Sequence, residues 1–216
     1  MKISNINNSP AFGAYHIANA KNFVNNVPNE LKIYELSVED KPFLQELKQK
    51  TNLEKLMPNI NKNELAVWNN IFNIAIQQAA AKTKNGLLAC FNDMPCGIAA
   101  FTRKPHSFKI DTICAIPTQN NGKIPLTGKS LFSIIFRDFL DSKAAFIDLD
   151  AVTNGPFSAV AKYMQLGFKQ RGGENGIIAM RINRDRACNS LAMLNGLIKV
   201  ETLNPDREIS LFNFLS

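Results

Sequence analysis

Phosphate binding is the first chemistry that the sequence offers, in residues 122–130, GKIPLTGKS. A glycine-containing loop that leads into a helix can bind phosphate through backbone amides, and a lysine at the helix start adds positive charge. The segment ends in Gly128-Lys129-Ser130, as a Walker A loop does, but five residues instead of four separate Gly122 from Gly128. Because the direction of each amide depends on this spacing, a nucleoside triphosphatase is disfavoured.

Histidine and cysteine offer little further chemistry. The two histidines, His16 and His106, do not stand at the spacing of a metal site such as HExxH. The four cysteines form no CxxC pair, which argues against a structural zinc site and a disulfide framework. We therefore expect no metal site, and neither a serine–histidine nor a cysteine–histidine hydrolase.

Hydrophobic periodicity predicts the elements that must position these residues. Apolar residues recur at helical spacing in residues 62–82, and three strand-like runs follow that are separated by turn residues, as in an antiparallel meander. The order of elements indicates an α/β fold of the α+β type. The expected elements are strands over 31–36, 87–91, 97–103, 108–116 and 145–152, helices from Ser37 to about 49 and over 62–82, 128–140 and 156–166, and a closing hairpin over 168–171 and 177–182.

The helix expected over residues 156–166 ends in a distinctive motif. Residues 159–168 read AVAKYMQLGF, so that Ala159, Tyr163, Leu166, Gly167 and Phe168 fall in the register A-x-x-x-Y-x-x-L-G-F. This motif resembles that of the GNAT N-acetyltransferase superfamily, which has the acyl-CoA N-acyltransferase fold. The order of elements from residue 33 to 182 is similar to that family as well. The resemblance implies a mixed, mostly antiparallel central sheet flanked by helices.

The resemblance also gives the loop at residues 122–130 a role. The family binds the diphosphate of coenzyme A in a loop of the form Q/R-x-x-G-x-G/A, whose amides face the phosphates at a helix start. When Gly128 is aligned with the last position, Lys123 takes the basic position and Leu126 the first glycine. Because leucine disfavours a positive φ and close backbone approach, we expect altered loop geometry or weak binding. The implied cofactor residues of this loop are Lys123, Leu126, Thr127, Gly128, Lys129 and Ser130.

Further contacts to acetyl-CoA are implied on two other segments. In the family the sheet splays at the fourth strand, and the pantetheine arm pairs with main-chain groups there. The matching residues are Cys114, Ala115 and Ile116. The family often has an asparagine seven residues before the tyrosine; that position is Pro156 in this chain, and Asn154 is close enough to replace it.

The resemblance implies that Tyr163 is the proton donor to the leaving thiolate. A phenol has an ordinary pKa of about 10, near that of a thiol. The alternative is a partly buried helix residue without a catalytic role. Asp111 is the candidate general base, or else a solvated carboxylate on its strand; Glu35, Asp148 and Asp150 are no better supported, and a relay through water needs no dedicated base.

The resemblance implies an acetyl-CoA-dependent N-acyltransferase that moves an acetyl group directly to a primary amine. The alternative is a catalytically weak or inactive GNAT-like module that binds acyl-CoA or a protein partner. The acceptor is expected to be a small-molecule or peptide amine, and a small amine, an aminoglycoside, a peptide N-terminus and lysine all stay open.

Composition narrows the class of protein. With 45% hydrophobic and 20% charged residues in 216, the chain is too apolar to be disordered. No apolar run approaches the length of a membrane helix, and the start lacks a secretory signal, so we expect a cytoplasmic protein without membrane contact. The net charge of +7 suits a polyanionic cofactor such as coenzyme A; lysine and arginine are scattered and no RNP pattern appears, so we expect no nucleic acid partner. The oligomeric state stays open.

Three segments are expected along the chain. Residues 1–30 contain eight asparagines and no sustained period, which predicts an Asn-rich N-terminal arm. Residues 31–182 form the expected GNAT-like domain. Residues 183–216 are expected to be a C-terminal extension packed on that domain, with a helix around 187–194 and short strands over 197–203 and 209–215.

Overall fold

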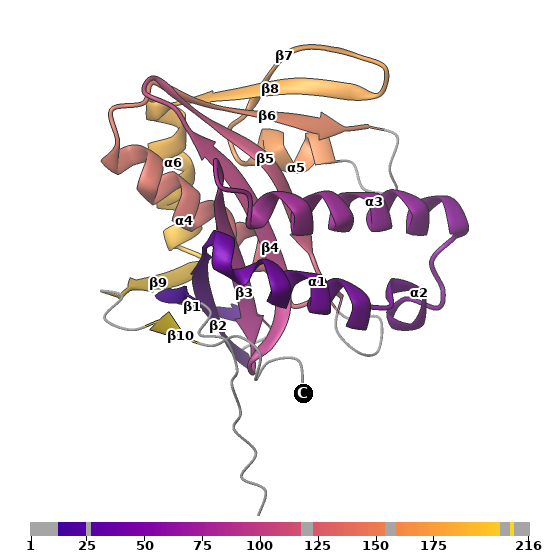
Figure 1. The fold of residues 1–216 in the computed structure, drawn as a ribbon. Coiled ribbons are helices and arrows are strands. Elements are labelled where there is room, and N and C mark those ends of the chain that lie inside the picture. Colours follow the sequence, from indigo (N-terminus) through magenta and orange to yellow (C-terminus); the bar gives the residue numbers. More distant parts are fainter. Residues whose placement is uncertain (1–12, 25–26, 118–122, 154–158, 204–207, 210–216) are drawn as a thin grey trace, which may run out of the picture.

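One twisted sheet organises the protein (Figure 1). The computed structural model describes residues 13–24, 27–117, 123–153, 159–203 and 208–209. Within these residues the sheet has ten strands in the order β10-β1-β2-β3-β4-β5-β6-β8-β7, and β9 also pairs with β1. The strands are β1 (Ala14–Val24), β2 (Val27–Leu36), β3 (Asn85–Phe91), β4 (Met94–Arg103), β5 (Ser107–Ala115), β6 (Phe146–Val152), β7 (Lys169–Glu174), β8 (Ile177–Asn183), β9 (Ile198–Thr202) and β10 (Glu208–Ile209).

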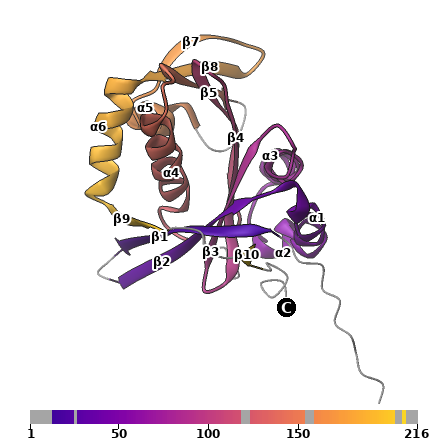
Figure 2. The ribbon, with the colours of Figure 1, turned by 60° about the vertical axis from the view of Figure 1, so that its left-hand side comes forward.

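Helices cover both faces of this sheet. They are the 3-10 helix η1 (Val38–Asp40) and α1 (Lys41–Lys50), α2 (Leu53–Leu56), α3 (Lys62–Ala79), α4 (Thr127–Asp141), α5 (Ala159–Gln165) and α6 (Arg184–Asn195). In Figure 2, α1 and α3 lie on one side of the sheet and α4 and α6 on the other. None of the helices in the described ranges is long and apolar enough to cross a membrane.

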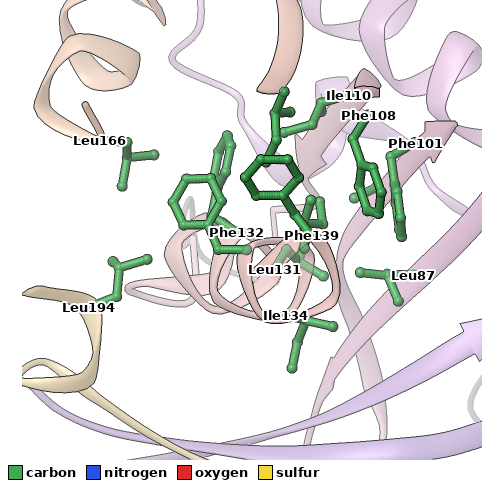
Figure 3. Packing of buried hydrophobic residues seen from close by; sticks show 14 of the residues in the cluster. Leu87, Phe101, Phe108, Ile110, Leu131, Phe132, Ile134, Phe139, Leu166 and Leu194 are labelled. Atoms are coloured by element: carbon green, nitrogen blue, oxygen red, sulfur yellow. The ribbon is translucent and has the colours of Figure 1, made fainter. Parts of the chain in front are cut away.

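Each face therefore has its own hydrophobic core. On one face, Phe43, Phe72 and Ile76 from α1 and α3 pack against β2 to β5. On the other face, α4 supplies Phe132 and Phe139 to a cluster that reaches α6 (Figure 3). The sheet thus lies between two helical layers, with one hydrophobic core on each of its faces, which is the usual way for such a sheet to bury both faces.

The sheet opens between β5 and β6, which form its parallel pair. They pair over only four residues each, from Ser107 opposite Phe146 to Ile110 opposite Leu149. Beyond this point β5 continues along β4 as far as Ala115, and β6 continues along β8 as far as Val152. Each strand is held on its outer side, so the separation creates a wedge-shaped opening inside a rigid sheet.

Most of the elements expected from the sequence are present, within a few residues. Ser37, where the first helix is expected to start, caps the helical segment, because its hydroxyl accepts a hydrogen bond from the Glu39 amide and the Asp40 carboxylate accepts one from the Ser37 amide. The short helix α2 was not expected. The helix expected over 156–166 is described only from Ala159, and the strand expected over 209–215 falls almost wholly outside the described residues.

The expectation of an N-terminal arm over residues 1–30 is wrong for its second half. Residues 14–24 form β1, which pairs with β2 on one edge and with β9 on the other. Ala18 and Ala20 are fully buried in the core next to α4. Small alanines among asparagines give a weak strand signal, and pairing with distant strands stabilises this segment. Residues 1–12 lie outside the described part of the chain.

The segment after residue 182 is continuous with the rest of the structure. Ala187 and Leu194 of α6 and Ile198 of β9 belong to the core around α4. Arg184, at the start of α6, donates hydrogen bonds to the carbonyls of Phe139 and Leu140 at the end of α4. The described part of this segment thus completes the core on the α4 face.

The contact between α3 and β3 gives a test of packing. A Cβ atom at Gly86 would collide with the carbonyl oxygen of Ala79 at the end of α3. We expect Gly86→Ala to lower the free energy of unfolding by about 1–3 kcal/mol, because the backbone must shift. Urea unfolding would measure this loss. Gly128→Ala is the matched control, since its Cβ meets no atom within 4 Å, and an equal loss in both variants would contradict this account.

Candidate functional site

Two cavities meet at the opening between β5 and β6. The smaller, of about 190 Å³, lies toward α3, and the larger, of about 660 Å³, extends along the start of α4 toward α6. Five residues line both cavities, and these are Ile113, Ala115, Lys123, Lys162 and Tyr163. A ligand that passes through the opening would therefore contact this shared set.

Leu126 shapes the start of α4, on the floor of the larger cavity. Its φ of 64° and ψ of 4° are left-handed, so leucine here takes a conformation that glycine adopts readily, and the expectation of altered loop geometry or weak binding stays a prediction. This left-handed conformation costs about 1–2 kcal/mol relative to ordinary backbone. The Leu126 carbonyl compensates by accepting from the amide and hydroxyl of Ser130, at 2.8 and 3.2 Å.

The start of α4 suits an anionic group. Leu126 provides no side-chain cap, so the first helical amides are not satisfied by its side chain, and the helix dipole favours negative charge. A Cβ at Gly128 would meet nothing within 4 Å, so a ligand can approach the backbone there. Lys129 lines the same cavity. These features fit the diphosphate site that the sequence predicts.

Two other residues of the predicted loop use their side chains internally. Ser130 is fully buried, and its hydroxyl bonds to its own helix. The hydroxyl of Thr127 donates to the carbonyl of Ile124, at 2.8 Å. Backbone amides are therefore what these two residues can offer to a ligand.

Tyr163 projects from α5 to the place where the cavities meet. Its ring packs against Phe132 and Phe168, with centroids 5.8 and 6.1 Å away. Burial raises the pKa of Tyr163 to about 12, and Cys114 adds a smaller effect in the same direction. The phenol is consequently protonated at neutral pH and can serve as a hydrogen-bond or proton donor.

Lys123 and Trp68 form one wall of the smaller cavity. The ammonium of Lys123 lies 4.1 Å from the centre of the Trp68 ring, in a cation–π contact. Burial lowers the pKa of Lys123, and the nearby charge of Lys162 lowers it further. The Lys123 ammonium thus lies against α3, on the wall that the two cavities share. Trp68 is buried in the core on the α3 face and also lines this cavity.

The end of β5 offers fewer main-chain groups than the sequence implies. The Ile116 amide is taken up by the carbonyl of Cys96, at 2.8 Å. This bond and the pairing of Gly97 with Ala115 direct the amide and carbonyl of Ala115 away from β4, toward the opening. The Ala115 carbonyl accepts from the Trp68 indole at 3.2 Å. The amide of Ile113, two residues earlier in the same register, faces the opening as well, so Ile113 and Ala115 are the β5 residues whose main-chain amides point toward it.

Cys114 is a buried structural residue. Its side chain packs in the core on the α3 face. Burial raises the pKa of its thiol to about 12, against smaller opposing effects from Trp68 and Lys123. Cys114 is therefore protonated at neutral pH and is no nucleophile.

The structure does not bring Asp111, the candidate general base, to either cavity. Asp111 is the extra residue of a β-bulge, because Thr112 pairs with Ala100 while Ile110 pairs with Phe101. Its carboxylate forms an ion pair with Lys84 and accepts from the Thr102 hydroxyl, both at 2.7 Å. The expectation that it acts as base is not supported by this placement.

The other carboxylates considered are also engaged elsewhere. Asp148 pairs with Arg181 at 2.6 Å, Asp150 with Lys109 at 2.9 Å, and Glu35 with Arg103 at 3.9 Å. Among the described residues that line the two cavities there is no carboxylate and no imidazole. In the described part of the chain, no group of three metal-ligating side chains is placed to hold an ion. Asn154 lies outside the described residues.

Comparison with known proteins places this geometry in context. No family model matches the sequence, and neither does any curated protein. Among solved structures, an uncharacterized protein from Bacillus halodurans aligns with a TM-score of 0.54 and 12% identity, over 82% of this chain and 95% of that one. Many other matching structures are acetyltransferases of the GNAT family.

Two of those acetyltransferases illustrate the sequence identities and TM-scores of these matches. The PaiA N-acetyltransferase of Thermoplasma acidophilum, solved with coenzyme A, aligns with 13% identity and a TM-score of 0.49, over 71% of this chain and 98% of its own. The ribosomal-protein-S18-alanine N-acetyltransferase of Escherichia coli aligns with 14% identity and a TM-score of 0.49, over 71% of this chain and 93% of its own.

The chain has a GNAT-like fold. Its large, mostly antiparallel sheet, flanked by helices, confirms the fold class predicted from the motif that ends in Phe168. At identities of 12 to 14% the likeness concerns the fold alone.

The position of Asp111 leads to a prediction. Asp111→Ala leaves the Lys84 ammonium and Thr102 hydroxyl without their carboxylate, so we expect the free energy of unfolding to fall by about 1–3 kcal/mol. Chemical denaturation would measure this. The control is Asp150→Ala, whose exposed pair with Lys109 contributes at most about 1 kcal/mol. An Asp111→Ala protein as stable as the wild type would show that this contact does not hold the bulge.

Proposed function

We propose that this protein is an acetyl-CoA-dependent N-acyltransferase that transfers the acetyl group directly to a primary amine. The observation that carries the proposal is the position of Tyr163, a protonated phenol on the wall shared by two cavities. One cavity begins at a helix start suited to phosphate, and the other is open to a second ligand. This arrangement supports a donor site and an acceptor site joined at one acid.

The larger cavity is the proposed donor site. The amides of Gly128 and Lys129 and the Lys129 ammonium would hold the diphosphate at the start of α4. The Ala115 amide, facing the opening, would bind the pantetheine arm. Acetyl-CoA supplies a thioester whose carbonyl carbon accepts an amine nucleophile.

Tyr163 would donate its proton to the leaving thiolate. An ordinary thiol has a pKa of about 8.5, below that of a phenol, so the transfer needs an environment that favours it. Burial raises the free energy of the Tyr163 phenolate and of the leaving thiolate alike, because both are anions in the same apolar surroundings. The surroundings of Tyr163 therefore keep the proton on the phenol until the thiolate develops.

The acceptor amine would lose its proton without a carboxylate base. The lysines of the shared wall, Lys123 and Lys162, place positive charge beside the acceptor cavity. Positive charge lowers the pKa of a neighbouring amine, since the ammonium form is repelled. Water can then accept the proton before attack.

A second candidate function is a GNAT-like module that binds acyl-CoA or a protein partner with little or no catalysis. Two observations favour it. The Trp68 indole donates a hydrogen bond to the Ala115 carbonyl, which a ligand would otherwise use, and the described residues that line the cavities include no carboxylate or imidazole. The two candidates differ in turnover.

Replacement of Tyr163 tests the proposed acid. We expect Tyr163→Phe to lower kcat by about 10²-fold or more, because an acid of this kind contributes about 10²–10⁴-fold, while the Kd for acetyl-CoA stays within about twofold. Thiol release and calorimetry would measure the two quantities. Unchanged kcat would remove Tyr163 from the mechanism.

The pH dependence gives an independent test of the same residue. Since the pKa of Tyr163 is raised to about 12, the proton donor stays intact through the alkaline range. We expect kcat/KM to rise with pH as the acceptor amine deprotonates, with no decline below about pH 11 that is due to Tyr163. A fall caused by loss of the Lys123 charge, whose pKa is lowered, should be absent from Lys123→Gln. A fall near pH 8–9 that persists in Lys123→Gln would point to a different acid.

The donor site is tested by filling the space beside Gly128. The branched side chain in Gly128→Val would project into the larger cavity, so we expect the Kd for acetyl-CoA to rise at least about tenfold. Calorimetric titration would measure it, with thermal unfolding as the control for an intact fold. If wild-type protein binds no acetyl-CoA, the proposed function is overturned.

A further inference from the structure

The smaller cavity is positively charged on one side. Lys123 and Lys162 line it, and its described lining contains neither aspartate nor glutamate. The Lys123 ammonium lies over Trp68, and Trp68 lines the smaller cavity only. The Lys123 ammonium therefore lies on the acceptor side of the wall that the two cavities share.

The two lysines create a potential that favours an anion. The charge of Lys162 lowers the pKa of Lys123, in addition to the larger effect of burial, which means that the ammonium groups repel each other. A carboxylate between them would relieve this repulsion. A second cation, such as a polyamine, an aminoglycoside or a lysine side chain, would increase it.

The rest of the cavity is apolar and small. Val67, Trp68 and Ile71 of α3 form one wall, and Val152 at the end of β6 contributes to the opposite side. The hydrogen bond from the indole to Ala115 fixes the large Trp68 side chain in place. The volume of about 190 Å³ lies below the range of about 300–1,000 Å³ typical of drug-sized ligands, so a small acceptor with an apolar body is favoured.

We propose that the acceptor is a free α-amino acid with an apolar side chain of about the size of leucine, whose carboxylate lies between Lys123 and Lys162. This inference rests on the proposed function. The side chain packs against Trp68 and Ile71, and the amino group faces Tyr163 at the shared wall.

The reaction balances with this acceptor. The neutral amino group attacks the thioester carbonyl carbon, a C–N bond forms and the C–S bond breaks. The thiolate takes the Tyr163 proton, and the nitrogen releases its surplus proton, which restores the phenol through water. Pairing of the carboxylate with the lysines also removes a negative charge that would otherwise keep a proton on the amine. The products are an N-acetyl amino acid and free thiol.

A matched pair of acceptors tests the carboxylate. L-leucine and L-leucinamide share the amine and side chain and differ in the negative charge. We expect kcat/KM with leucine to exceed that with leucinamide at least about tenfold, and spermidine and kanamycin to stay at the rate of a no-acceptor control. Thiol release, with mass spectrometry of the acetylated product, measures each.

Variants of three lysines separate acceptor binding from donor binding. Lys123 and Lys162 line both cavities, so Lys123→Gln and Lys162→Gln should raise KM for leucine at least about tenfold and raise the Kd for acetyl-CoA by a clearly smaller factor. Lys129 lines only the larger cavity, so Lys129→Gln should do the reverse, weakening acetyl-CoA binding and leaving KM for leucine unchanged.

The outcomes distinguish this inference from the proposed function. If leucinamide or a cationic amine is acetylated as well as leucine, or if Lys123→Gln weakens only acetyl-CoA binding, the carboxylate inference is wrong while the acyltransferase stands. If acetyl-CoA binds and no amine of the set is acetylated, the inference is overturned and the non-catalytic module is favoured. If acetyl-CoA does not bind, both proposals fail.

Discussion

The separation of β5 from β6 after Ile110 and Leu149 is the constraint on which the rest of the structure depends. A strand that loses its neighbour exposes amide and carbonyl groups, and these must find other partners when buried. Here the outer edges stay paired with β4 and β8, so the opening cannot close by sliding. The exposed carbonyl of Ala115 is satisfied by the Trp68 indole. The bulge at Asp111, directly after the last β5 residue that pairs with β6, is held by Lys84 and Thr102.

The two helical layers then give the opening two different sides. On the α4 side, a left-handed leucine and a glycine present backbone amides to the larger cavity. On the α3 side, Trp68 and aliphatic side chains close the smaller cavity. Tyr163 stands between them because Phe132 of α4 and Phe168, after α5, pack on its ring. A change in the α4 core would therefore move the proposed acid as well as the proposed donor site.

Features that depend on local sequence were predictable, and those that depend on distant partners were not. The Ser37 cap, the amphipathic α3 and the Tyr163 motif are encoded within a few residues. The strand β1 was missed because its partners lie at 198–202 as well as next to it in sequence. The ion pair of Asp111 with Lys84 and the contact of Lys123 with Trp68 join residues far apart, so neither role was visible from spacing. The left-handed Leu126 contradicts residue preference, and bonds from Ser130 to its carbonyl hold it.

Protonation at the opening follows from charge and burial together. A carboxylate base would be neutralised by ion pairing beside Lys123 and Lys162, and a buried one would itself resist ionisation. A positive wall instead acts on the amine directly, by destabilising its ammonium form. The same burial that makes Tyr163 a weak acid destabilises the thiolate it would protonate. In the proposed mechanism the acid and the activated amine would therefore need no further titratable group between them, and the opening in the sheet would bring both to one wall.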